Sequence, residues 1–90
     1  MKRYQLRLFV AGRSARSERA IANLRRICQE DLGGDCDLSI IDVLEHPQEA
    51  ENEKILATPT LIKSGPLPIR RFIGDLSVRE RVLAGLEQQT

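Results

Sequence analysis

Aromatic residues, cysteine and histidine are scarce in this chain of 90 residues. Tyr4, Phe9 and Phe72 are the only aromatic residues, so the core must be built mainly from aliphatic side chains. The two cysteines are too few for a disulfide-built scaffold, and they are not spaced as a Cys-X-X-Cys pair. The single histidine, His46, has only Glu45 beside it as a possible second ligand. The sequence therefore predicts neither a metal site nor a bound cofactor.

The chain also lacks a long apolar run, a signal-peptide pattern and a strong net charge. No apolar stretch approaches the roughly 18 residues that a membrane-spanning helix requires. A net charge of +1 gives no general attraction to nucleic acid or to anionic membranes. A chain of this length makes one small domain, which we assign to residues 1–90. We therefore expect a cytoplasmic protein with reduced thiols that binds neither nucleic acid nor membrane.

The first half of the sequence has the pattern of a strand, a helix and a second strand. Residues 4–11 end in a run that is apolar on both faces, which is typical of a central strand covered on both sides. Ser14 can cap a helix with an apolar stripe, and the pair Gly33-Gly34 ends it. Residues 38–43 predict the next strand. A strand–helix–strand unit makes these two strands parallel.

The second half begins with a short polar helix and a proline placed directly before a strand. Pro47 can open the helix at residues 48–54. Pro59 precedes a strand at residues 60–63, the position at which thioredoxin-like domains carry a cis-proline. Either a cis bond or an ordinary trans proline at the start of an edge strand fits this spacing. A turn rich in glycine and proline and a short strand at residues 69–73 predict an antiparallel hairpin.

The last element is predicted to be a helix at residues 77–87. Ser77 and Glu80 have the spacing of a capping box, in which the two residues satisfy each other's free N–H groups. Gly85, inside this helix, costs about 1 kcal/mol relative to alanine. The complete order, β-α-β-(short α)-β-β-α, predicts an α/β fold of the thioredoxin-like class.

Catalytic chemistry is disfavoured by the sequence itself. A thioredoxin-like oxidoreductase needs a cysteine of low pKa at the start of its first long helix, where the helix dipole stabilises a thiolate. Residues 12–17 occupy that position here, and they include no cysteine. Cys28 lies late on the apolar stripe and is interpreted as a core residue, whereas Cys36 is predicted to lie in a loop. We therefore expect a non-enzymatic binding module, with a small redox protein as the alternative.

Four blocks of the sequence resemble the KaiB family of circadian clock proteins, and the last two are the most specific. The resemblance runs from Tyr4 to Leu86. The blocks are LFVAG at residues 8–12, IDVL at residues 41–44 followed by Pro47, KILATPTL at residues 54–61, and IGDLS at residues 73–77.

The resemblance implies a protein-binding function. Members of this family bind the ATPase ring of KaiC, sequester KaiA, and compete with a sensor kinase whose sensory domain is itself KaiB-like. The resemblance also implies metamorphic behaviour, which requires two packings within a few kcal/mol of each other. One state is a thioredoxin-like monomer that binds KaiC. The other is a tetramer-forming ground state in which the C-terminal half is refolded.

The C-terminal half contains signals for both states. The capping box favours a helix after Leu76, whereas Gly85 and the β-branched Val78 and Val82 weaken it. We expect the thioredoxin-like state to dominate. The chain departs from the family at Val78, where an acidic residue is usual, and in its short tail after Leu86. The short tail argues against a tetramer and a full clock role, so a monomer or dimer and a stress-response role are alternatives.

By position, the resemblance marks six residues as partner-contact or fold-switch residues. For each of them the alternative is an ordinary solvated surface residue. A further alternative for the whole chain is a stand-alone sensory domain of the kinase type, although no coiled-coil or catalytic segment follows. The six residues are Lys54, Arg71, Gly74 and Asp75, with Arg19 and Arg25 on the exposed face of the first helix.

Overall fold

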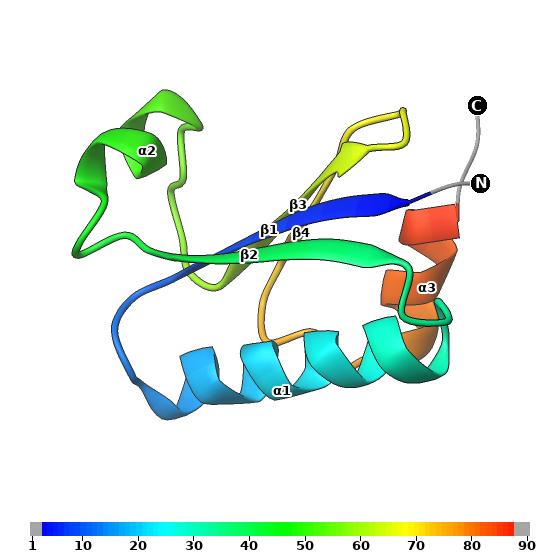
Figure 1. Cartoon of the computed structure of the whole chain (residues 1–90). Coiled ribbons are helices and arrows are strands. Elements are labelled where there is room, and N and C mark those ends of the chain that lie inside the picture. Colours follow the sequence, from blue (N-terminus) through cyan, green and yellow to red (C-terminus); the bar gives the residue numbers. More distant parts are fainter. Residues whose placement is uncertain (1–2, 88–90) are drawn as a thin grey trace.

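The computed structural model describes residues 3–87 of the chain. Their elements follow the predicted order, which is confirmed (Figure 1). The elements are β1 (Tyr4–Val10), α1 (Ala15–Glu30), β2 (Cys36–Asp42), α2 (Pro47–Asn52), β3 (Thr60–Gly65), β4 (Arg70–Ile73) and α3 (Arg79–Glu87).

The strands form one mixed sheet in the order β2-β1-β3-β4. Strand β1 is parallel to β2 and antiparallel to β3, so that Leu8 lies opposite Ile40 on one side and Leu61 on the other. Strands β3 and β4 form the predicted antiparallel hairpin. The predicted parallel pair and the interior position of β1 are therefore both confirmed.

Helices α1 and α3 cover the same face of the sheet, whereas the short α2 lies on the other side, near one end (Figure 1). The expectation that helices cover both faces of β1 therefore holds only in part. The main core lies between the sheet and the two longer helices, because alternate strand residues point to that face. Its buried members include Leu6, Leu8 and Val10 from β1, Ala20, Leu24 and Ile27 from α1, and Val82 and Leu86 from α3.

Two contacts complete the packing of the sheet. On the face opposite α1, the Arg7 guanidinium lies 5.6 Å from the centroid of the buried Phe9 ring, an arrangement that favours a cation–π interaction. The side chain of Lys63 in β3 is only 1% exposed. Its ammonium group donates a hydrogen bond of 3.3 Å to the carbonyl oxygen of Leu86. This bond ties the last turn of α3 to the sheet.

Four local predictions need correction or completion. Strand β2 begins at Cys36, so this residue is on a strand and not in a loop. Helix α3 begins at Arg79, two residues later than predicted. The N–H of Ser77 donates to Asp75 Oδ1 at 3.1 Å, so the predicted capping box with Ser77 as N-cap is wrong. At Pro59 the peptide bond is cis, which decides between the two alternatives left open.

Within residues 3–87, no helix combines the length and the apolar character needed to span a membrane. The same residues include no group of three or more His, Cys, Asp or Glu side chains that could hold a metal ion.

Candidate functional site

A groove of about 310 Å³ lies where the end of β4 turns into α3. Three of the six residues marked by sequence line it together: Arg71, Gly74 and Asp75. The groove also contains two exposed apolar side chains, because Ile73 is 73% and Val78 49% exposed. Exposed apolar side chains beside charged ones are typical of a protein-binding surface. Val78 is also the position at which the family resemblance would place an acidic residue.

The floor of the groove is a loop with unusual backbone angles. Gly74 has a φ of +120° and open space around it, and its N–H donates to the carbonyl oxygen of Pro59 at 3.0 Å. Leu76 has a φ of +63°, which is uncommon for a residue with a side chain. Its side chain is 6% exposed and packs in the main core. Burial of Leu76 therefore offsets the backbone strain and fixes the loop to the sheet.

Asp75 connects this loop to helix α1. Its carboxylate accepts hydrogen bonds from the N–H of Ser77 at 3.1 Å and from Arg19 Nε at 3.3 Å. The amide nitrogen of Asn23 donates to the backbone carbonyl of Asp75 at 2.8 Å. Hydrogen bonding to the Ser77 side chain and, to a lesser degree, to Arg19 lowers the pKa of the Asp75 carboxyl, because both favour its charged form. The structure thus brings two of the marked residues, Arg19 and Asp75, into direct contact.

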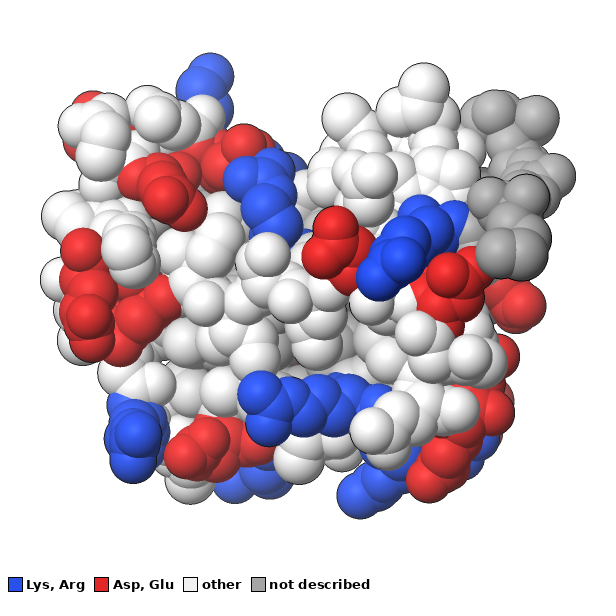
Figure 2. Space-filling model, viewed as in Figure 1, with Lys and Arg blue, Asp and Glu red and all other residues white. Residues whose placement is uncertain are grey.

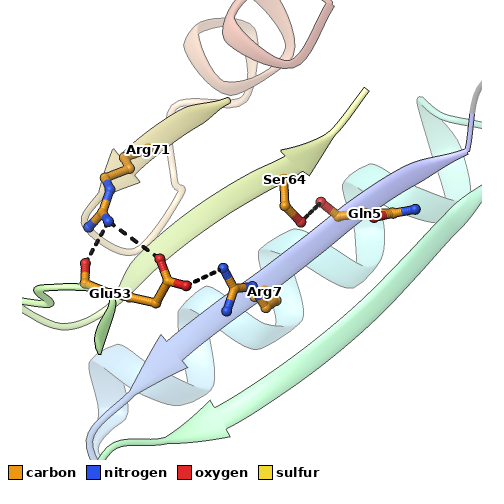
Figure 3. Close-up of polar contacts among 5 residues, drawn as sticks. All are labelled: Gln5, Arg7, Glu53, Ser64 and Arg71. Atoms are coloured by element: carbon orange, nitrogen blue, oxygen red, sulfur yellow. Dashed lines mark hydrogen bonds and ion pairs between the residues drawn. The ribbon is translucent and has the colours of Figure 1, made fainter. Parts of the chain in front are cut away.

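A second polar cluster lies over the face of the sheet that is turned away from α1 (Figure 3). Glu53 accepts from Arg7 Nη2 at 2.9 Å through Oε2, and its Oε1 lies 3.7 Å from Arg71 Nη2. The backbone carbonyl of Glu53 also accepts from Arg71. Arg71 therefore takes part in both the cluster and the groove, and it links the segment after α2 to β4.

Sequence reasoning missed Arg7 and Glu53. A signal for Arg7 was available, because it is the one charged residue in the strand and stands between Leu6 and Leu8. Glu53 gave no such signal within a run of glutamates. Figure 2 shows acidic side chains gathered over α2, at the upper left, and this supports the solvated-face interpretation for the rest of that run. The side chains of Glu49 and Glu51 are exposed.

Two marked residues lie apart from the groove. Lys54 is exposed and follows Glu53 with a φ of +55°, so it adjoins the second cluster. Arg25 is exposed on α1 and lines a different hollow, together with Ile21 and Asp42. The structure therefore does not gather all six marked residues into one site.

Thioredoxin-like oxidoreductases need a thiolate at the start of their first long helix. In this chain, Ser14 caps that end of α1. The Ser14 hydroxyl oxygen accepts from the N–H of Ser17 at 3.1 Å, as an N-cap does. Cys28, near the other end of α1, is buried in the core as predicted.

Comparison with known proteins agrees with this geometry. A family model described as the KaiB domain matches residues 7–88 of the chain. The chain belongs to the KaiB family. Circadian clock protein KaiB3 of Synechocystis sp. is 60% identical over 87 residues, which cover 97% of this chain and 85% of that protein. The circadian clock oscillator protein KaiB of Synechococcus elongatus is 55% identical over 86 residues, covering 96% and 84%.

Solved structures show that this KaiB-family chain has a thioredoxin-like fold, as predicted. The N-terminal domain of Synechococcus elongatus SasA superposes with a TM-score of 0.78 and 25% identity, covering 99% of this chain and 88% of that one. Mitochondrial thioredoxin 3 of Saccharomyces cerevisiae superposes with a TM-score of 0.72 and 22% identity, covering 93% and 76%. At that identity the second likeness concerns the fold alone.

Proposed function

We propose that this chain is a non-enzymatic regulator that docks on a KaiC-like ATPase and modulates its clock or stress-response output. Family membership supports the proposal, because relatives at 55–60% identity are named as circadian clock proteins. The single observation that carries the docking site is the groove at the end of β4, where Arg71, Gly74 and Asp75 meet exposed apolar side chains. In this proposal, the form of the chain that docks is a cytoplasmic, thioredoxin-like monomer.

The chemistry of the groove suits a partner segment that carries an apolar side chain next to carboxylates. Ile73 and Val78 offer apolar contact, and Arg71 and Arg81 supply positive charge at the edges. The charge of Asp75 is already compensated within the chain by Arg19. Apolar burial supplies most of the affinity of such an interface, and the charges orient the partner.

Competition with a sensor kinase is part of the same proposal. The likeness to the SasA N-terminal domain supports it, because two domains of one fold can present similar surfaces to one partner. KaiA is a further candidate partner. A small redox protein, the alternative function, is disfavoured because Ser14 caps the helix end at which a reactive thiolate would be needed.

Fold switching also stays within the proposal. The loop from Gly74 to Leu76 is held to α1 mainly through Arg19 and Asn23, contacts that a refolded C-terminal half would break. Loss of these contacts would free the loop that leads into α3. The refolded state would then be the one that forms dimers or tetramers.

A binding assay with a KaiC homologue and ATP tests the docking site. By gel filtration, wild type is expected to co-elute with the ATPase ring, and Ile73→Glu is expected to abolish co-elution. Ile73 is exposed, so the substitution changes the groove without removing a core side chain. Asp75→Arg should also abolish binding, whereas Asp37→Arg on the exposed part of β2 should leave it intact.

Circular dichroism of each variant distinguishes lost docking from lost folding. The proposal is wrong if no KaiC-type ring binds the folded wild-type chain while the chain reduces insulin through its thiols. It is also wrong about the groove if Ile73→Glu and Asp37→Arg bind as well as wild type does.

A further inference from the structure

The two cysteines of the chain, eight positions apart in sequence, lie on either side of the turn that joins α1 to β2. Cys28 belongs to the end of α1, and Cys36 is the first residue of β2. The two thiols lie close enough that each affects the pKa of the other. Cys28 is 6% exposed within the main core, and Cys36 packs against that core while keeping part of its surface accessible. Both residues are free thiols in this structure.

The backbone holds these two thiols together from both sides. The N–H of Gly34 donates to the carbonyl oxygen of Cys28 at 2.7 Å, which closes the turn after α1. On the strand side, Tyr4 lies opposite Cys36, and its N–H donates to the carbonyl oxygen of Asp35 at 3.0 Å. Gly33 and Gly34 have positive φ angles and open space around them, so the turn can adjust without a clash.

We propose that Cys28 and Cys36 are an oxidation site that forms a reversible intramolecular disulfide when the protein meets a peroxide. Two features support this pairing: Cys36 packs against the core cluster that contains Cys28, and Cys36 keeps part of its surface accessible. The proposal is independent of KaiC docking. It differs from thioredoxin chemistry, because neither cysteine is at the start of α1.

The reaction balances with a peroxide as the only oxidant. The accessible Cys36 sulfur attacks the peroxide O–O bond and becomes a sulfenic acid, with release of one water. The Cys28 sulfur then attacks the Cys36 sulfur, its proton leaves with the hydroxyl group as a second water, and the S–S bond forms. The two thiols together lose two electrons and two protons. A dithiol reductant reverses the reaction by thiol–disulfide exchange.

Burial explains why Cys28 should react with Cys36 and not with external reagents. Desolvation raises the pKa of the Cys28 thiol to about 12, and the neighbouring Cys36 thiol adds to this effect. Desolvation raises the pKa of the Cys36 thiol as well, so both thiolates are minor species at neutral pH and the peroxide step is slow there. Large reagents do not reach the buried Cys28 sulfur. A partner sulfur that packs against the same core cluster can react within the chain, without an encounter with an external reagent.

The disulfide would close a short loop that carries Asp31. This residue accepts a hydrogen bond of 2.8 Å from Arg79 Nε in the first turn of α3. Oxidation would therefore cross-link the segment between α1 and β2, to which Arg79 of α3 is bound through Asp31. Because a cross-link restricts the unfolded chain, we expect the oxidised protein to unfold at a higher temperature than the reduced protein.

Mass spectrometry of the native full-length chain tests the proposal. After hydrogen peroxide treatment, alkylation under denaturing conditions should find no free thiol in wild type, and the monomer should have lost two hydrogens. Cleavage after glutamate cuts at Glu30, between the two cysteines, so the resulting peptides should stay joined until a dithiol is added. Cys28→Ser and Cys36→Ser are the matched controls, and neither can form the internal link.

The proposal is overturned if wild type keeps both thiols, if Cys36 gains oxygen atoms without any linkage, or if links form only between chains. Overnight equilibration with oxidised glutathione provides a second measurement that does not depend on the rate of the peroxide step. There the internal disulfide is expected, and a stable mixed disulfide at Cys36 with Cys28 still free would contradict the pairing.

Discussion

The ring of Phe72 in β4 packs so closely on Gly85 of α3 that a Cβ atom at position 85 would lie 2.4 Å from the ring Cε2 atom. From sequence, Gly85 was interpreted only as a weak point in the helix. The structure gives it a packing role, because the missing side chain lets the helix approach the aromatic ring. Gly85 therefore belongs to the contact that holds α3 on the sheet.

Gly85→Ala is expected to destabilise the protein by about 1 kcal/mol, although alanine favours helix formation. The gain in helix propensity is about 1 kcal/mol, whereas overpacking costs about 1–3 kcal/mol. Urea unfolding measures the difference. In a Phe72→Val background the same substitution should be neutral or stabilising. Ala84→Gly, at an exposed position of the same helix, is the control for propensity alone. A more stable Gly85→Ala protein would contradict the packing role.

Asp75→Asn should lower the melting temperature near neutral pH but not in acid. The pKa of Asp75 is lowered in the folded state, chiefly by hydrogen bonding to the Ser77 side chain and then by Arg19. The charged carboxylate therefore stabilises the fold above the unfolded-state pKa of about 3.8, and this contribution is lost as pH falls through the lower folded-state pKa. Melting curves of both proteins between pH 7 and pH 2, taken as roughly the range over which carboxylates titrate, measure the effect.

Asp37→Asn controls for the loss of one negative charge at an exposed site. The melting temperatures of wild type and Asp75→Asn should converge at the acid end of the series. If the difference persists unchanged there, the contacts of Asp75 do not depend on its charge.

Glu53→Gln should cost about 1 kcal/mol or less at low salt, because the pairs with Arg7 and Arg71 are both partly exposed. Added salt should shrink the difference from wild type, since it screens exposed charges. Glu49→Gln, in the same acidic region but exposed on α2, should have a smaller effect. Equal effects of the two substitutions would mean that the Glu53 cluster is only a solvated surface.

Thr60→Val should destabilise the protein by about 1–2 kcal/mol. Thr60 is 3% exposed, and its hydroxyl donates to the carbonyl oxygen of Ala57 at 2.6 Å. Valine has nearly the same shape but leaves that carbonyl without its donor. Thr60→Ser keeps the hydroxyl and loses only a methyl group. Chemical denaturation should therefore rank Thr60→Ser above Thr60→Val, and the reverse order would contradict the importance of this bond.

Part of the candidate site could be anticipated, because the resemblance marked Arg71, Gly74 and Asp75 before their positions in space were known. Their binding role stays a prediction. The pairings could not be anticipated: Arg19 and Asp75 are 56 positions apart, and Arg7 and Glu53 are 46 apart. No spacing rule connects side chains at such separations.

The sequence by itself determined the order of elements, the parallel pair of β1 and β2 and the hairpin of β3 and β4. These features follow from patterns that repeat over a few residues and from short connections, which act locally. Only the tertiary structure decided that Arg19 pairs with Asp75 and that Cys36 packs against the core cluster that contains Cys28. The physical reason is that a polar group or a sulfur atom bonds to whatever packing brings within reach, and packing is a property of the whole chain.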